Sequence, residues 1–275
     1  MSECFDLDGY LRRVGYHGPR TPELTTLRAL HARHVRSIPF ENLDPLLGRP
    51  VLLDLPSLTA KLVHGRRGGY CFEQNLLFKA ALEAVGFQVT GLAGRVRWRV
   101  PPERPLGPRT HMLLRVELAG RSYLADVGFG AQLLDAPLAL EAGLEQRTPV
   151  ATYRLTEQDG RLGLEVQHES QWQLMYLFGL DPQVQADYEM GSWFTATHPH
   201  SWFRHRLFVE RLGREARHTL ANTSLLERRY DGAVIERRLA SPRELAQALE
   251  RIFDLSPPVA AEALYARIAP LSTRP

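Results

Sequence analysis

The sequence predicts an α+β protein in which helices, strands and a mixed region follow one another along the chain. Three observations support this fold class. Apolar residues recur at helical spacing up to Phe87, and from Gln88 to about Val166 they follow the two-residue period of strands. Beyond that point, aromatic-rich, strand-like and helical segments are mixed. Helices and strands that form separate runs are typical of α+β architectures.

Three helices are predicted in the first part of the chain. The segment Phe5–Tyr16 places its apolar residues at helical spacing. Thr21–Ile38 begins with a threonine that can cap the helix and has Pro22 at the first helical position, where an N–H group is not needed. Phe72–Gly86 is amphipathic and ends at a glycine, the residue preferred just beyond a helix.

Strands are predicted from Gln88 onwards. The segments that alternate or contain short apolar runs are Gln88–Val100, His111–Gly120, Arg121–Gly130 and Thr152–Glu169. Within the last of them, Asp159 and Gly160 form a dipeptide typical of a two-residue hairpin. The prolines between Pro101 and Pro108 exclude a central strand, because proline has no N–H for the ladder, and they predict a loop.

The last part of the chain combines both kinds of element. Arg217–Tyr230 and Ala233–Ala240 have strand-like patterns, and an aromatic-rich stretch precedes them. Ser241–Leu255 is a predicted helix. It has serine as the N-cap, proline at the next position and Glu244 three residues after the cap, which together form the pattern of a capping box.

Composition and charge exclude several classes of protein. The 275 residues carry a net charge of +3, and no block of basic residues resembles a nucleic-acid-binding arm. No apolar run reaches the roughly 18 residues of a membrane span, and the N-terminus is acidic where a signal peptide is basic. Two cysteines cannot form a disulfide framework. We therefore expect a cytoplasmic protein without a nucleic-acid or membrane partner.

Cys71 follows two glycines and a tyrosine at the predicted start of a helix. Gly68 and Gly69 can adopt tight backbone conformations that lead the chain into this helix. The first turn of a helix has unpaired N–H groups and a dipole that favours the thiolate, the nucleophilic form of cysteine. The same N–H groups can hold an oxyanion. Cys71 is therefore a candidate nucleophile, and a small buried apolar residue is the alternative interpretation.

A cysteine nucleophile needs a histidine, and the histidine needs an acid or an amide to orient it. The chain has 10 histidines, so composition does not select one. His111 opens one predicted strand and Asp126 ends another, directly before the Gly128–Gly130 turn, so two neighbouring strands could bring these side chains together. A structural histidine and a turn-capping aspartate remain the alternatives.

Metal and phosphate sites are not predicted. The pairs His31/His34 and His198/His200 are the patterns closest to a metal site, but neither has cysteine or acidic partners at ligand spacing. The glycine-rich turn at 128–130 is followed by neither a dinucleotide fingerprint nor a P-loop lysine. We therefore expect no metal.

Several stretches resemble the arylamine N-acetyltransferase family in its bacterial form. The most specific are RGGYCFEQN, THMLL and YLADVGFG, which contain Cys71, His111 and Asp126 in that order. The stretches FDLDGYLRRVG, HVRSIPFENLD and THPHSWF agree as well. The resemblance therefore extends from the N-terminus to Phe203.

The resemblance implies a core like that of transglutaminase-like and papain-like proteins, with a Cys-His-Asp triad. Carried over to this sequence, Cys71 is the nucleophile, His111 is the base and acid, and Asp126 orients the histidine. The family has three domains, which correspond here to a helical domain at 1–87, a β-barrel-like domain at 88–190 and an α/β lid at 191–275.

The resemblance also implies the substrates. Acetyl-CoA would be the acyl-donor cosubstrate, and Cys71 would pass the acetyl group to an arylamine, arylhydrazine or N-hydroxyarylamine in a ping-pong reaction. CoA and a small aromatic amine or hydrazine are thus the expected partners. The family's substrate pocket corresponds to Phe40, Val96 and Phe129. Positions near the acyl group and CoA correspond to Thr110, Gly128, Phe129 and Gly130.

Other functions remain open from the sequence. An amide synthase of antibiotic biosynthesis has the same triad but closes a macrolactam. A transglutaminase-like cysteine protease or hydrolase would need an open groove and access of water to the thioester. A degenerate member serving as a binding module would not need the intact triad. The loop Pro101–Pro108 does not match the family pattern, which leaves the acceptor preference open.

Overall fold

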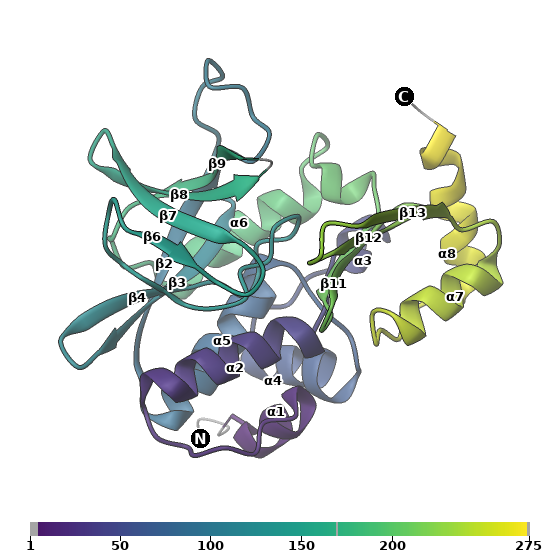
Figure 1. Cartoon of the computed structure of the whole chain (residues 1–275). Coiled ribbons are helices and arrows are strands. Elements are labelled where there is room, and N and C mark those ends of the chain that lie inside the picture. Colours follow the sequence, from purple (N-terminus) through teal and green to yellow (C-terminus); the bar gives the residue numbers. More distant parts are fainter. Residues whose placement is uncertain (1–4, 169, 274–275) are drawn as a thin grey trace.

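The computed structural model describes residues 5–168 and 170–273 as two sheets surrounded by helices. In Figure 1 most of the N-terminal helices lie together at the bottom, the larger sheet lies above them, and the smaller sheet lies beside the C-terminal helices at the right. The predicted succession of helical and strand-rich regions is confirmed. No helix of the described chain is long and apolar enough to cross a membrane.

The helical region comprises α1 (Leu7–Val14), α2 (Leu24–Ser37), α3 (Leu43–Leu46), α4 (Leu55–Leu58), a π-helical turn (Thr59–His64) and α5 (Cys71–Val85). The predicted start of the second helix is wrong, because α2 begins at Leu24 and Thr21 lies outside it. Glu23 stands at the N-cap, and its side chain makes no capping hydrogen bond. The buried face of α2, which includes Leu27 and Leu30, stabilises the helix instead.

Helix α5 begins at the candidate nucleophile and is largely buried. At its start, the Glu73 carboxylate accepts a hydrogen bond from the Tyr70 N–H at 3.1 Å, as the third residue of a capping box does. At its end, Gly86 has φ = 105°, a left-handed conformation that glycine adopts without strain. The predicted helix and its glycine terminus are confirmed.

The larger sheet has the order β5-β4-β3-β2-β9-β8-β7-β6 and curls into a barrel-like shape (Figure 1). Its strands are β2 (Gln88–Val96), β3 (His111–Leu118), β4 (Arg121–Ala125), β5 (Leu138–Ala139), β6 (Glu145–Arg147), β7 (Thr152–Gln158), β8 (Arg161–His168) and β9 (Gln171–Phe178). Asp159 and Gly160 join β7 to β8 with positive φ angles, as the hairpin prediction requires. The prolines at 101–108 lie in the predicted loop, between β2 and β3.

The sequence pattern does not predict β9, although this strand lies in the middle of the larger sheet. It pairs with β2 on one side, where Phe178 faces Gly94, and with β8 on the other. Its second half, from Met175 to Phe178, is buried on both faces. Such a run has no polar alternation, and periodicity alone does not separate it from a buried helix.

The smaller sheet has the order β1-β10-β11-β12-β13. Its strands are β1 (Phe40–Glu41), β10 (Phe208–Leu212), β11 (Ala216–Ala221), β12 (Ser224–Arg229) and β13 (Val234–Arg238). The strands predicted in the last third are confirmed, the first as the pair β11 and β12 joined by a turn at Asn222. Strand β1 comes from the helical region and pairs with β10, so it places Phe40 beside the smaller sheet.

The later helices are α6 (Gln185–Thr197), α7 (Pro242–Arg251) and α8 (Ala261–Ile268), with 3-10 turns at Trp202–Arg204 and Ala269–Thr273. Helix α7 begins as predicted, because the Ser241 hydroxyl accepts from the Glu244 N–H at 3.2 Å. The Glu244 carboxylate accepts from the Ala240 N–H rather than from Ser241. The sequence pattern does not predict α6 or α8. The boundary proposed after residue 190 falls inside α6, and the three-domain division stays a prediction.

Three apolar clusters form the interior of the described chain, and the candidate site lies between two of them. The first joins α1, α2 and α5 to β3 and β4, and it includes Cys71 and Met112. The second lies between the smaller sheet and helices α7 and α8. The third fills the larger sheet and includes Phe129 and Tyr176. Helix α5 therefore lies against the strand that begins at His111.

Candidate active site

Cys71 is the first residue of α5, and its side chain is buried, with an exposed fraction of 5%. Its thiol donates a long hydrogen bond to the Thr110 carbonyl oxygen at 3.5 Å. The turn before it requires glycine, because a β-carbon on Gly68 would lie 1.9 Å from the Pro39 carbonyl oxygen. Gly128 also packs closely, since a β-carbon on it would lie 2.7 Å from the Cys71 Cα. Gly68 therefore lets the turn before Cys71 pack against Pro39, and Gly128 lets the loop after Asp126 pack against Cys71 itself.

His111 opens β3 and lies between Asp126 and Cys71. Its Nε2 is 2.6 Å from Oδ2 of Asp126, and a side-chain hydrogen bond with Cys71 acts on the same ring. Because Nε2 is occupied by Asp126, Nδ1 is the nitrogen available to the thiol. The Phe129 ring meets the imidazole edge to face, with ring centroids 5.1 Å apart, and the Tyr176 ring centroid lies 4.7 Å from that of the imidazole.

The pairing of β3 with β4 explains why these two residues meet. Leu114 faces Ala125 across the antiparallel ladder, so the end of β4 lies beside the beginning of β3. Asp126 follows β4 directly, and His111 is the first residue of β3. Both residues lie at strand ends, as the sequence predicts, and the register brings them into contact.

Asp126 is fully buried and accepts hydrogen bonds from four donors. Oδ1 accepts from the Asn75 side-chain amide at 3.0 Å and from the Gly128 N–H at 2.9 Å. Oδ2 accepts from His111 and from the Tyr176 hydroxyl, the latter at 2.9 Å. Both oxygens therefore accept from two donors each. This suits an ionised carboxylate, which only accepts hydrogen bonds, and it does not suit a protonated acid or an amide, which also donate.

The buried pair of His111 and Asp126 is held in its charged form. Burial by itself lowers the pKa of His111, but the charge of Asp126, its hydrogen bond and the interaction with Cys71 raise that pKa from 6.5 to about 10. Burial raises the pKa of Asp126, whereas His111, Asn75 and the Gly128 N–H lower it, and the net shift is downward. A protonated imidazole therefore lies beside the Cys71 side chain.

The two histidines of α2 contact opposite halves of the site. The side-chain amide nitrogen of Gln74 donates to the Pro39 carbonyl at 2.8 Å, so the side-chain oxygen Oε1 of Gln74 is the atom that faces His34. His34 Nε2 donates to this oxygen at 2.7 Å. The remaining nitrogen, Nδ1, accepts from the Tyr10 hydroxyl at 2.9 Å. This chain of hydrogen bonds connects α1 and α2 to the glycine turn that precedes the nucleophile.

His31 binds the other half of the site. Its Nε2 accepts from the Asp126 backbone N–H at 3.3 Å. Burial lowers the pKa of His31 to about 4 and that of His34 to about 3, so both rings are neutral near pH 7. Within the described residues, no group of three or more histidine, cysteine, aspartate or glutamate side chains is arranged to hold a metal ion.

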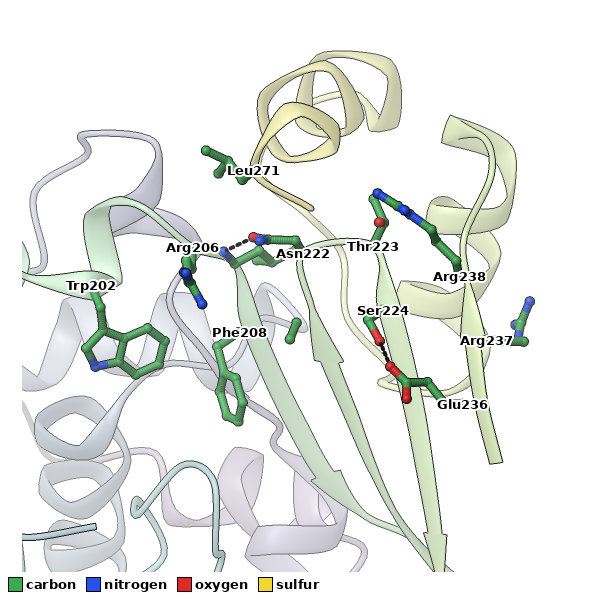
Figure 2. Close-up of a pocket in the computed structure, with 12 residues that line it drawn as sticks. Trp202, Arg206, Phe208, Asn222, Thr223, Ser224, Glu236, Arg237, Arg238 and Leu271 are labelled. Atoms are coloured by element: carbon green, nitrogen blue, oxygen red, sulfur yellow. Dashed lines mark hydrogen bonds between the residues drawn. The ribbon is translucent and has the colours of Figure 1, made fainter. Parts of the chain in front are cut away.

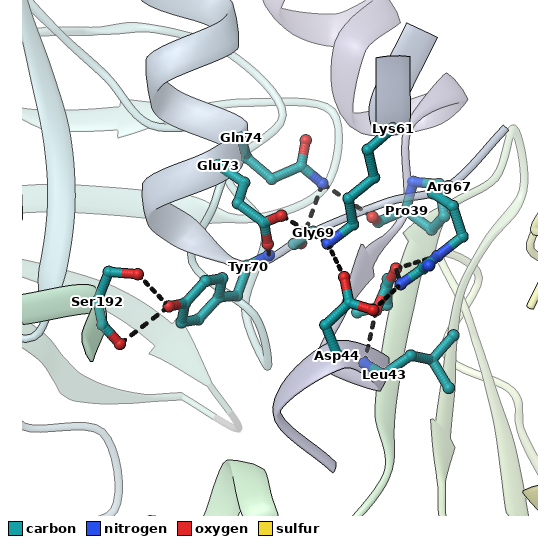
Figure 3. A network of polar contacts seen from close by, with 11 residues as sticks. Pro39, Leu43, Asp44, Lys61, Arg67, Gly69, Tyr70, Glu73, Gln74 and Ser192 are labelled. Carbon is teal, nitrogen blue, oxygen red and sulfur yellow. Dashed lines mark hydrogen bonds and ion pairs between the residues drawn. The ribbon is translucent and has the colours of Figure 1, made fainter. Parts of the chain in front are cut away.

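A buried charged cluster lies beside the glycine turn (Figure 3). Lys61 pairs with Asp44 at 2.6 Å and with Glu73 at 2.5 Å, while Arg67 pairs with Glu41 at 2.7 Å and with Asp44 at 3.1 Å. Burial raises the pKa of Glu73 to about 6, although Lys61 opposes this shift. Removing one member would leave an uncompensated buried charge, so the cluster holds the segments around the turn in place.

The predicted substrate-pocket residues lie close to this centre. Phe40 is buried, and a β-carbon on Gly130 would lie 2.5 Å from its ring. Phe129 lies against His111. Val96 is further out, at the end of β2, where it faces Tyr176 in the ladder. Thr110 contributes its carbonyl group to the thiol of Cys71.

Sequence reasoning missed the groups that hold Asp126. Asn75 lies four residues after Cys71, on the same face of α5, so helical spacing could have identified it. Its amide donates to Asp126 and to the Met112 carbonyl, and its oxygen accepts from the Val127 N–H. Tyr176 carries no such signal, because it comes from the strand that the pattern does not predict.

Comparisons with known proteins agree on one family. A family model described as N-acetyltransferase matches residues 23–260. The arylamine N-acetyltransferase of Mycolicibacterium smegmatis is 44% identical over 92% of this chain and 92% of its own. The structure of the Salmonella typhimurium enzyme superposes with a TM-score of 0.91, at 40% identity over 96% of this chain and 98% of that one. The Mycobacterium marinum enzyme in complex with CoA gives 0.89, at 38% identity, covering 96% and 99%.

Proposed function

Since this chain belongs to the arylamine N-acetyltransferase family and is therefore an acyltransferase, we propose that it acetylates aromatic amines through an acetyl-cysteine on Cys71. Acetyl-CoA is the proposed donor. Arylamines, arylhydrazines and N-hydroxyarylamines are the proposed acceptors, and the cytoplasm is the proposed compartment. The observation that carries the proposal is the buried line of Cys71, His111 and Asp126 at the start of α5.

In the first half-reaction, the Cys71 thiolate attacks the acetyl carbonyl carbon of acetyl-CoA. A new C–S bond forms to Sγ, and the C–S bond to CoA breaks. The CoA thiolate leaves and takes the proton held by His111. One thioester replaces another, so the exchange is close to thermoneutral and the acetyl group stays activated. The nucleophile's position at a helix N-terminus stabilises the negative charge that develops on the carbonyl oxygen.

In the second half-reaction, the nitrogen of the aromatic acceptor attacks the acetyl carbon. His111 takes a proton from the nitrogen as the C–N bond forms, and the C–S bond to Cys71 breaks. Cys71 is regenerated as a thiolate beside the imidazolium. No oxidant and no metal is required to balance either half-reaction.

The residues around the triad hold its geometry. Asp126 keeps Nε2 of His111 as the donor and leaves Nδ1 facing the thiol. Tyr176 and Asn75 fix the carboxylate, each through one hydrogen bond. The buried aromatic rings of Phe40 and Phe129 exclude water from the thioester and suit a flat apolar acceptor.

Release of CoA without an acceptor tests the proposal. We expect a burst of about one CoA for each active site, followed by a slow phase, because the acetyl group remains on Cys71 until an amine arrives. The intact protein should gain the mass of one acetyl group, located on the Cys71 peptide, and an aromatic amine or hydrazine should remove it. Double-reciprocal plots at several acceptor concentrations should be parallel.

Two outcomes of this experiment would contradict the proposal. Fast continuous release of CoA without an amine would indicate a hydrolase, the alternative in which water reaches the thioester. Intersecting lines without acetylated protein would indicate direct transfer between two bound substrates. A carrier-bound chain that discharges the acyl-enzyme faster than aromatic amines do would favour the amide synthase.

A further inference from the structure

A cavity of about 760 Å³ lies between α2, the turn that joins β10 to β11, and the end of α7. On α2 it is lined by residues at helical spacing, which share one face of the helix: Ala29, Ala32, Arg33 and Arg36. His31 and His34, which contact the candidate active site, lie on the opposite face of the same helix. The cavity is therefore separate from the Cys71 centre.

Cations surround this cavity. Among the described residues, the charged and titratable side chains that line it are those of Arg33, Arg36, Arg211, Arg214, Arg251 and His218, and no carboxylate is among them. Five guanidinium groups around one space repel one another, which disfavours the empty cavity. The cavity beside β12 and β13, by contrast, has the carboxylate of Glu236 among its arginines (Figure 2). The cavity at α2 therefore attracts anions.

Three of its arginines have donors to offer a ligand. In the part of the chain that the structure describes, the side chains of Arg36, Arg214 and Arg251 make no hydrogen bond or salt bridge. The Nε of Arg36 is buried and has no partner, whereas buried polar groups are ordinarily hydrogen-bonded. Arg214 and Arg251 are exposed, so they can turn towards a ligand without losing an existing bond.

Arg211 connects two walls of the cavity. Its Nε donates to the Arg36 carbonyl oxygen at 2.6 Å, and its Nη1 donates to the Ile252 carbonyl oxygen at 3.0 Å. It thus joins the C-terminal ends of α2 and α7. The carboxylate whose charge acts on Arg211 is Asp254, which already pairs with two other arginines. The walls are therefore held together without neutralising the arginines that face the cavity.

The lining favours a small compound with several phosphate groups. Guanidinium binds phosphate oxygens in pairs, and ligand sites typically have volumes of roughly 300–1,000 Å³. A single phosphate carries about two negative charges at most, and it would meet only some of the arginines. Among the described residues, no phenylalanine, tyrosine or tryptophan lines the cavity, so it offers no such ring on which a nucleobase could stack.

We propose that this cavity is a binding site for oligophosphates and similar small molecules with several phosphate groups, which Arg36, Arg214 and Arg251 contact. The ligand satisfies the free donors and offsets the repulsion among the arginines, so its binding stabilises the folded chain. The inference does not depend on the proposed function, because it involves neither the acyl donor nor the acceptor.

Calorimetry with inorganic tripolyphosphate tests this site. The variant R214A/R251A should bind tripolyphosphate about 100-fold more weakly than the wild type, because each charge-assisted contact contributes about tenfold. R214K/R251K should lose about tenfold or less, since lysine keeps the charge but not the paired N–H groups. R12A/R121A is the matched control, because it removes two exposed arginines that lie outside the cavity, and its affinity should stay within about twofold of the wild type.

Thermal unfolding gives a second readout. Tripolyphosphate should raise the unfolding midpoint of the wild type and of R12A/R121A, and it should leave that of R214A/R251A nearly unchanged. Equal affinities of the wild type and R214A/R251A would overturn the proposal, as would orthophosphate that binds as tightly as tripolyphosphate. Sedimentation with phosphatidylcholine vesicles that contain phosphatidylinositol bisphosphate separates a lipid from a soluble ligand. If the vesicles bound through these arginines and tripolyphosphate did not bind, the soluble ligand would be wrong.

Discussion

Cys71→Ala is expected to abolish acetyl transfer while the protein stays folded. The nucleophile of a covalent mechanism has no substitute, so turnover should fall by about 10⁵-fold or more. The fold should tolerate the change because the thiol makes only a long hydrogen bond, at 3.5 Å to the Thr110 carbonyl, and its interaction with His111. The loss of stability should be about 1 kcal/mol, the usual scale for one small buried group.

The measurements for this variant are acetyl transfer to an aromatic amine, the CoA burst and thermal unfolding. Cys71→Ser should also lack a burst, because a serine hydroxyl is a far weaker nucleophile than a thiolate at neutral pH. Cys4→Ala is the control, since it removes the only other thiol of the sequence. If Cys71→Ala kept turnover near that of the wild type, the assignment of the nucleophile would be wrong.

Asp126→Asn is expected to cause the second largest loss, in both activity and stability. Each carboxylate oxygen accepts from two donors, so an amide nitrogen in either orientation would face two N–H or O–H groups. Leaving two buried donors unpaired should destabilise the fold by roughly 2–6 kcal/mol, about 1–3 for each. The imidazole would also lose the partner that fixes its tautomer, and kcat should fall on the order of 10³- to 10⁴-fold.

The pH dependence of stability separates this effect from a general loss of packing. Burial lowers the pKa of His111 and Asp126 raises it, to about 10 against 6.5 for the free group. The native state therefore holds a proton that the unfolded state has lost. The stability from this pair is complete below pH 6.5 and is lost as pH rises through about 10.

Asp126→Asn should consequently flatten the dependence of the unfolding free energy on pH between 6.5 and 10. Urea unfolding at several pH values measures this. Tyr176→Phe is the matched control, because it removes one donor to the same carboxylate and leaves the charged pair intact. An asparagine variant with full activity and an unchanged pH profile would show that the imidazole is oriented by other groups.

Local sequence patterns predict much of the fold. The helical spacing of α1 and α5, the glycine that ends α5 and the Asp-Gly turn between β7 and β8 all act within a few residues. The start of α2 and the strand β9 depend on tertiary packing and burial instead of on local sequence patterns. Packing of Leu27 and Leu30 stabilises α2 without its predicted cap, and burial of β9 on both faces removes the alternation that identifies a strand.

For the candidate site, the sequence by itself determined the nucleophile's local setting. The glycines, the tyrosine and Cys71 are consecutive, and Asn75 is one helical turn away, so their positions follow from the backbone of α5 alone. Their positions at predicted strand ends made His111 and Asp126 candidates, and the resemblance to a family selected them. Spacing could not choose them, because 10 histidines offered the same chemistry.

The tertiary structure alone decided which groups complete the site. The register of β3 and β4 brings His111 to Asp126, and the unpredicted β9 brings Tyr176 to the same carboxylate. These contacts join residues far apart in the chain, and they depend on sheet register and burial. Local hydrogen bonding determines neither, because a one-residue slip of a strand keeps its pattern while turning every side chain to the other face.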